Sequence, residues 1–158
     1  MLKTLLLTTP SLTPLLLRLV LGLVILPHGL QKAFGLFGGF GFTATMQYFG
    51  SLHIPPVFGL LAILAESVGA LMLIFGAATR LAALGVGVTM TVAALTVHLP
   101  NGFFMNWFGQ QKGEGLEFFL LAVTMSLALV ARGAGALSID RSLTGTRSAD
   151  ELPAYQRA

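Results

Sequence analysis

Four long runs of apolar residues, separated by short polar or glycine-rich segments, dominate the pattern along the chain. The runs cover residues 12–31, 57–77, 81–99 and 114–132, and each approaches the ~20 residues that a helix needs to cross a bilayer. They predict an all-α integral membrane four-helix bundle that occupies residues 1–140. Residues 132–158 are polar, so we expect them to dangle or lie along the surface, with 141–158 as a polar tail.

The two longer connections each carry a pattern of their own. In the first, Phe42, Met46, Phe49 and Leu52 recur every three or four residues with polar residues between them. This spacing predicts a short amphipathic helix at the membrane interface, which Pro55-Pro56 ends. The second connection, residues 100–113, holds an aromatic cluster typical of an interfacial belt: Phe103, Phe104, Trp107 and Phe108.

Composition supports the membrane interpretation. Of the 158 residues, 55% are hydrophobic and 9% are charged, whereas a soluble domain averages roughly 25% charged. The first apolar run also resembles a signal peptide, but it contains Arg18 and no small-residue cleavage pattern follows it. The chain has no cysteine, which excludes disulfide exchange, iron–sulfur clusters and thiolate zinc sites formed by this chain alone. Its basic residues are dispersed, so nucleic acid is not an expected partner.

Charges at the ends of the runs predict the orientation in the membrane. Lys3, Arg80 and the arginines beyond residue 131 fall on one side, and Lys32 and Lys112 fall on the other. The positive-inside rule then makes both termini cytoplasmic, and it puts loops 33–56 and 100–113 in the periplasm of a bacterium. Within the third run, Ala83 and Gly87 lie one helical turn apart, a spacing that lets two helices approach closely in lipid.

Six ionisable residues lie inside or at the edges of the apolar runs, where a charge is costly unless it has a partner or a task. They are Arg18, His28, Lys32, Glu66, His98 and Glu117. Counting residues inward at ~1.5 Å each predicts two tiers. The upper tier, near the outer surface, holds His28, Lys32, His98 and Glu117. The lower tier is an Arg18–Glu66 pair near the middle of the membrane.

Each of these residues also has a purely structural interpretation. The Arg18–Glu66 pair could lock two helices together, and Lys32 could extend its ammonium to the lipid headgroups. His98 could end its helix at the interface, and Glu117 could favour a helix N-terminus. His28 is the hardest to explain structurally, because its imidazole lies beside Pro27 and shares a helix face with two cations.

The same residues carry a resemblance to a known family. The chain resembles the DoxX family of four-helix bacterial inner-membrane proteins over residues 18 to 140. The stretches that match are Arg18-Leu-x-Leu-Gly22, His28-Gly29-x-x-Lys32, Ala65-Glu66-x-x-Gly69, Gly76-x-x-Thr79-Arg80, Val97-His98-x-x-Asn101-Gly102, Gly115-x-Glu117 and Gly133-x-Gly135-x-x-Ser138-Ile-Asp140. The resemblance implies a candidate oxidoreductase. Some relatives are subunits of a thiosulfate:quinone oxidoreductase, and others associate with superoxide-handling and sulfur-transfer proteins. Distant relatives that assist disulfide chemistry do not fit a chain without cysteine.

The leading hypothesis is a quinone-linked membrane redox protein, or a subunit of a redox complex. His28, Lys32, His98 and Glu117 are the expected catalytic residues, and His28, His98, Glu66 and Arg18 are the expected cofactor-binding residues. A quinone is the expected cofactor, with a bis-histidine haem or a zinc ion held by His28, His98 and Glu117 as alternatives. The main alternative function is a non-catalytic scaffold that recruits redox partners; a small-solute transporter is a weaker one. Membrane lipid, redox proteins and a second copy of the chain are the expected partners.

Overall fold

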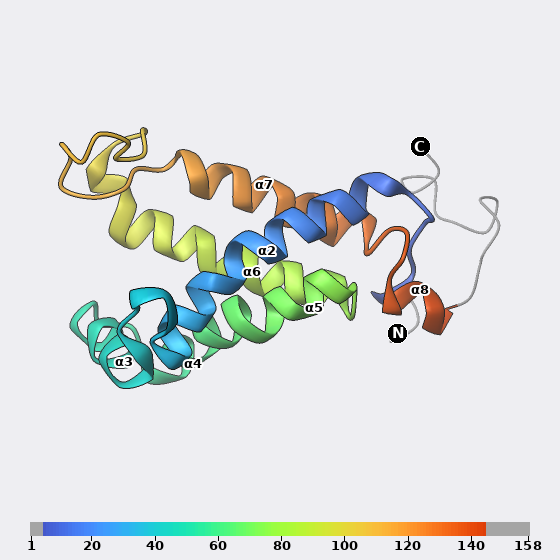
Figure 1. The fold of residues 1–158 in the computed structure, drawn as a ribbon, viewed down its shortest axis with the longest axis horizontal. Helices are drawn as coiled ribbons and strands as arrows, with labels where there is room; N and C mark the ends of the chain where they lie inside the picture. The colour runs from blue at the N-terminus through green and yellow to red at the C-terminus, as the bar shows by residue number, and fades with distance from the viewer. Residues whose placement is uncertain (1–4, 145–158) are drawn as a thin grey trace.

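Helices form the regular structure of the chain, as seen in a computed structural model that describes residues 5–144 (Figure 1). Two of the long helices contain a π-turn, where the hydrogen-bond ladder widens by one residue. The elements in order are α2 (Leu12–Phe34), a 3-10 turn (Leu36–Gly38), α3 (Gly41–Ser51), α4 (Pro56–Leu64), the π-turn Ala65–Gly69, α5 (Ala70–Phe75), α6 (Thr79–Ala93), the π-turn Ala94–His98, a 3-10 turn (Leu99–Asn101), α7 (Glu117–Arg132) and α8 (Ile139–Thr144).

The all-α membrane architecture is confirmed. Three continuous helical stretches are long and apolar enough to cross a bilayer, namely Leu12–Phe34, Pro56–Phe75 and Thr79–Asn101. The fourth, α7, has 16 residues and starts at Glu117, three residues later than predicted. The reason is local: residues 114–116 fold back on the preceding loop, where the amide of Leu116 donates to the carbonyl of Gly102 at 3.1 Å. The amphipathic helix expected in the first loop is α3.

The four long helices run side by side along the longest axis of the molecule, and the connections gather at its two ends (Figure 1). We call one end the loop end; it holds α3 and the loop of residues 102–116. The other, the tail end, holds the start of α2, the α5–α6 turn and α8. The first and last described helices therefore meet at one end of the bundle, as an even number of crossings requires.

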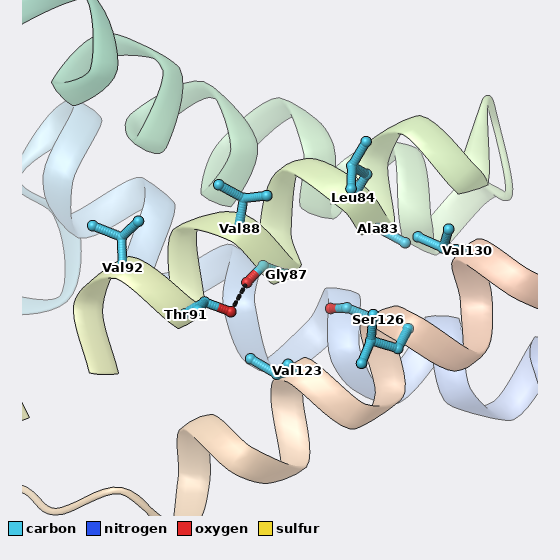
Figure 2. Close-up of a pocket in the computed structure, with 10 residues that line it drawn as sticks. Ala83, Leu84, Gly87, Val88, Thr91, Val92, Val123, Ser126 and Val130 are labelled. Carbon is cyan, nitrogen blue, oxygen red and sulfur yellow. Dashed lines mark hydrogen bonds between the residues drawn. The ribbon is translucent and has the colours of Figure 1, made fainter. Parts of the chain in front are cut away.

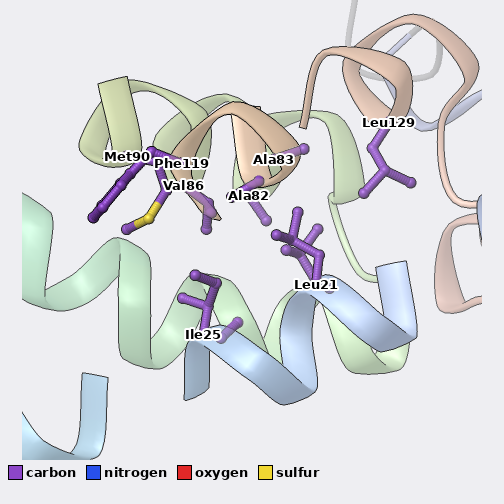
Figure 3. Packing of buried hydrophobic residues seen from close by; sticks show 11 residues of the cluster. Leu21, Ile25, Ala82, Ala83, Val86, Met90, Phe119 and Leu129 are labelled. Atoms are coloured by element: carbon purple, nitrogen blue, oxygen red, sulfur yellow. The ribbon is translucent and has the colours of Figure 1, made fainter. Parts of the chain in front are cut away.

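The core lies between α2, α5, α6 and α7 and consists of leucine, isoleucine, valine, alanine, methionine and phenylalanine side chains (Figure 3). Leu21 and Ile25 of α2 face Val86 of α6, and both are almost fully buried. The close approach predicted at Gly87 is also present. A Cβ atom at Gly87 would lie 2.9 Å from the Cβ of Ser126 on α7. Small residues on α6 thus set the spacing between α6 and α7.

The segment that follows α7 differs from the expected free tail. Residues 133–136, Ser138 and Asp140 are buried at the tail end, and α8 packs there. The carboxylate of Asp140 accepts hydrogen bonds from the amides of Ala78 (2.6 Å) and Thr79 (2.9 Å), which begin α6. The prediction was wrong for residues 133–140 because these contacts join segments far apart in the chain. Residues 145–158, the rest of the predicted tail, lie outside the described residues.

Candidate functional site

A buried ion pair near the loop end is the most unusual feature of the bundle interior. The ammonium of Lys32, in the last turn of α2, contacts the carboxylate of Glu66 between α4 and α5. The Glu66 side chain is 4% exposed and the Lys32 side chain is 29% exposed. Burying both charges is costly unless they stay paired. Lys32 is therefore not simply extended toward lipid headgroups; it neutralises a carboxylate inside the bundle.

The backbone around Glu66 is irregular, and this places its side chain. Glu66 lies in the π-turn Ala65–Gly69, where one residue is inserted into the helical ladder. Such insertions leave a backbone carbonyl without its usual partner, and they occur frequently at functional sites. Ser67 provides one compensating bond, because its hydroxyl donates to the carbonyl of Ile63 at 2.6 Å. The inserted residue rotates Glu66 toward α2.

Gly29 brings α2 against this π-turn. A Cβ at Gly29 would lie 2.3 Å from the carbonyl oxygen of Glu66 and 2.5 Å from the amide nitrogen of Ser67. Both distances are far inside van der Waals contact, so only glycine allows the two backbones to approach this closely. Lys32 follows Gly29 by three residues, and this approach puts its ammonium within reach of Glu66.

We therefore expect Gly29→Ala to separate α2 from the π-turn and to destabilise the protein by about 2 kcal/mol, as overpacking of a tight contact does. The free energy of unfolding in detergent measures the effect. Gly50→Ala on α3 is the matched control, because a Cβ there meets nothing within 4 Å. Equal stability of the Gly29 and Gly50 variants would contradict this account of the contact.

The two histidines are connected through a pair of phenylalanine rings on α7. His28 lies 6.2 Å from Phe118 and His98 lies 4.2 Å from Phe119, measured between ring centroids. Phe118 and Phe119 contact each other edge to face at 5.3 Å. His28 precedes Lys32 by four residues on α2, so both side chains lie on the same face of the helix. His98 places its Nδ1 2.8 Å from the carbonyl of Glu114, in the loop of residues 102–116.

Glu117 is the first residue of α7, and its carboxylate is bound to the loop that precedes the helix. Its carboxylate accepts hydrogen bonds from the amide of Met105 (3.0 Å) and from the indole of Trp107 (2.9 Å). Glu114 acts similarly and accepts from the amide of Asn106 at 2.6 Å. These bonds shape the loop of residues 102–116. Glu117 is thus bound to the loop, as His98 is, while Lys32 is bound to Glu66.

Arg18 is not the partner of Glu66, so the predicted lower tier is wrong. Its guanidinium lies at the tail end and donates to five backbone carbonyls, which matches its five N–H groups. The acceptors are Leu73 and Ile74, at the end of α5, and Ala134, Ala136 and Leu137, after α7. All five N–H groups donate to these carbonyls, and none remains for the carboxylate of Glu66.

The observed site therefore consists of Lys32, Glu66 and His28. Among the described residues, no group of three or more His, Cys, Asp or Glu side chains could hold a metal ion. His28, His98 and Glu117 are accordingly not assembled as a zinc site. The two imidazoles contact different phenylalanine rings, Phe118 for His28 and Phe119 for His98.

Sequence reasoning missed several residues that shape the two ends of the bundle. Asp140 was noted only as part of a family stretch, although it caps α6. Arg80 enters the orientation argument and one family stretch, but its bonds to the carbonyls of Val130 and Ala131 at the end of α7 are not predicted. An arginine beside a helix break and an aspartate after a glycine-rich turn are the signals that could have indicated such caps.

Comparison with known proteins gives two matches. The family model described as DoxX matches residues 13–99 of the chain. The chain is also similar to a Bacillus subtilis (strain 168) protein named "Putative oxidoreductase CatD". The two are 31% identical over 126 residues, which cover 80% of this chain and 83% of the relative. No solved structure gives a significant match.

Proposed function

The chain belongs to the DoxX family, and from this premise we propose that it is a membrane redox protein that handles a quinone at the Lys32–Glu66–His28 site. The name of the Bacillus subtilis relative supports a redox role. The observation that carries the proposal is the buried Lys32–Glu66 pair at a π-turn, with His28 one helical turn before Lys32 on the same face of α2. Charges are costly in the apolar interior of a membrane bundle, and helices that only pack against one another do not need an ion pair there.

The three side chains have the chemistry that a quinone head requires. Reduction of a quinone to a quinol takes up two electrons and two protons. The Lys32 ammonium and the His28 imidazole can donate hydrogen bonds to carbonyl oxygens, and the Lys32 charge favours negative charge developing on such an oxygen. Glu66 can release and accept a proton, and its contact with Lys32 provides a short transfer path between the two.

The electrons must come from a partner or go to one, and the loop end offers a surface for it. Phe103, Phe104, Trp107 and Phe108 are exposed on the loop that Glu114 and Glu117 hold in shape. Rigid, exposed aromatic side chains are typical of protein contact surfaces. We propose that a redox partner docks on this loop, close to His98. In the scaffold alternative, recruiting this partner is the only function of the protein.

We further propose the orientation that the charge pattern predicts, in the inner membrane of a bacterium. The tail end carries Arg80, Arg132 and Arg141, whereas the loop end carries Lys32 and Lys112. The positive-inside rule makes the tail end cytoplasmic. The Lys32–Glu66–His28 site then lies near the periplasmic surface, and a partner would approach the loop end from the periplasm.

The test is binding of a short-chain ubiquinone analogue to the purified full-length protein in lipid nanodiscs, measured by calorimetry. Loss of one charge-assisted hydrogen bond is worth about 1.5 kcal/mol or more, so we expect Glu66→Gln and His28→Ala each to weaken binding about tenfold. His53→Ala, in the exposed turn after α3, is the matched histidine control and should bind like the wild type. Unchanged affinity in both site variants would overturn the quinone proposal and favour the scaffold.

A further inference from the structure

Three exposed phenylalanine rings at the end of α2 are not explained by the proposed quinone site. Along the sides of the bundle, exposed apolar side chains such as Val92, beside the groove between α6 and α7, face the lipid (Figure 2). Phe34, Phe37 and Phe40 are 71%, 69% and 88% exposed, and they lie instead where α2 ends and the chain turns toward α3. We call residues 34–41 the phenylalanine turn.

The phenylalanine turn folds back along α2 instead of continuing away from it. The amide of Gly35 donates to the carbonyl of Gln31 at 3.1 Å, and the side-chain amide of Gln31 donates to the carbonyl of Phe37 at 3.2 Å. Gly39 lies so close that a Cβ atom there would be 2.5 Å from the Cα of Gln31. The turn therefore lies beside the last helical turn of α2, level with residues of a helix that is long and apolar enough to cross a bilayer.

The backbone at Phe37 is strained. Its φ of 53° is in the left-handed region, which disfavours residues that carry a Cβ atom. Such strain persists only where the surrounding structure enforces it, and it occurs frequently at functional positions. Here the Gln31 hydrogen bond holds the turn in place. A ring that is 69% exposed gains little from the rest of the chain, so a gain that offsets the strain has to come from outside the chain.

The chemistry of the phenylalanine turn matches lipid. Residues 33–52 carry no acidic or basic side chain, and the turn is continuous with the lipid-facing side of α2. The other aromatic segment of the loop end, residues 102–116, differs because it contains Lys112, Glu114 and several amide side chains. Apolar aromatic side chains without neighbouring charges insert at the boundary between lipid headgroups and acyl chains. The two aromatic surfaces of the loop end are therefore suited to different partners.

We propose that the phenylalanine turn is inserted into the lipid leaflet at the loop end, whereas the loop of residues 102–116 faces water. The 23 residues of α2 span ~34 Å, slightly more than the ~30 Å of a hydrocarbon core. Its last turn, with the phenylalanine turn beside it, then lies at the boundary between headgroups and acyl chains. Lys32 directly follows Gln31, so the inserted rings hold the Lys32–Glu66 pair at this depth. The insertion does not require that a quinone binds.

The test uses single cysteines in the full-length protein, which has no cysteine of its own. A spin label is attached at Phe40→Cys and, as a matched control, at Phe108→Cys, because the two side chains are 88% and 87% exposed. In liposomes of phosphatidylethanolamine and phosphatidylglycerol, electron paramagnetic resonance measures collisions of each label with oxygen, which concentrates in lipid, and with a water-soluble nickel chelate. The Phe40→Cys label should favour oxygen several-fold, and the Phe108→Cys label should favour the chelate. The proposal is overturned if both labels behave alike, or if the Phe40→Cys label is shielded from both reagents, as a protein partner or a second copy would do.

A second experiment tests whether the rings cause the insertion. Phe37→Asn/Phe40→Asn removes two rings, and asparagine tolerates the left-handed backbone at the first position. A label at Leu36→Cys should favour oxygen when both rings are present and the chelate in the double variant. A label at Leu23→Cys, which is 59% exposed in the middle of α2, should favour oxygen in both, as a folded and inserted bundle requires. An unchanged Leu36→Cys label in a correctly inserted double variant would overturn the proposal.

Quenching by brominated lipids provides a measurement without a spin label, because Trp107 is the single tryptophan of the chain. The variant Phe40→Trp/Trp107→Phe moves this tryptophan to the phenylalanine turn and should be quenched several-fold more strongly than the wild type. Equal quenching would contradict the insertion. None of these measurements involves a quinone, so this proposal and the quinone proposal can fail separately.

Discussion

Replacing Arg18 by lysine is expected to destabilise the protein by about 3 kcal/mol, although the charge is retained. The five N–H groups of Arg18 each reach a carbonyl, and the residue is 1% exposed. Lysine has three donors on a single nitrogen, so at least two carbonyls lose their partner in a site that water does not reach. Each unpaired buried group costs about 1–3 kcal/mol. The free energy of unfolding in mixed micelles, from titration with a denaturing detergent, measures the loss.

Arg141→Lys provides the control, because Arg141 is a partly exposed residue on α8 at the same end. Its substitution should change stability by less than about 0.5 kcal/mol, as surface changes usually do. A double variant with Glu66→Gln tests the pairing that the sequence suggested. Arg18 and Glu66 share no partner in the structure, so their effects should add within about 0.5 kcal/mol. A larger departure from additivity would show that Arg18 and Glu66 interact, as the sequence predicted.

The second large effect is a loss of folding stability when the Lys32–Glu66 pair is broken. The loss should be larger when Lys32 is replaced than when Glu66 is replaced. Lys32→Met leaves the carboxylate of Glu66 buried without its cation, which should cost about 3 kcal/mol. Glu66→Leu leaves Lys32, whose side chain is 29% exposed and can extend its ammonium toward water, so the loss should be about 1 kcal/mol. The same micelle unfolding assay reports both values.

The double variant Lys32→Met/Glu66→Leu distinguishes folding from function. Replacing both ions by apolar side chains of similar size is often neutral or stabilising, so stability should return to the wild-type value or above. Quinone binding should still be lost, because the donor and the proton carrier are both gone. A double variant that is stable and binds quinone normally would show that the pair serves the fold alone. A double variant as unstable as Lys32→Met would contradict the ion-pair account.

The misplacement of Glu66 shows where counting along a sequence fails. Counting inward from Val57 puts Glu66 deep in the bilayer, yet the structure puts its carbonyl against Gly29, near the loop end of α2. The reason is that α4 begins beyond the end of α2, where it packs against α3. Apolar periodicity marks the length of a helix but not its offset along its neighbour. The partner of a buried charge depends on that offset.

The contacts of His28, His98 and Glu117 also could not be predicted from the sequence. The sequence indicated that both histidines lie toward the loop end, and the structure agrees. It could not indicate that Phe118 and Phe119 contact one ring each, because helix rotation is set by packing on all sides. It could also not indicate that the carboxylate of Glu117 is bound to loop amides, since that loop has no periodic pattern.

The sequence by itself determined the membrane class, the number of long helices, the interfacial helix α3 and the family, because these follow from apolar run length, periodicity and motif order. It also identified the costly charges. Only the tertiary structure decided their partners: Glu66 with Lys32, Arg18 with five carbonyls, and Asp140 with the start of α6. A hydrocarbon environment requires every buried charge and polar group to be satisfied, but many pairings meet that requirement. The close approach of α2 to the π-turn at Gly29 favours the Lys32–Glu66 pairing that forms.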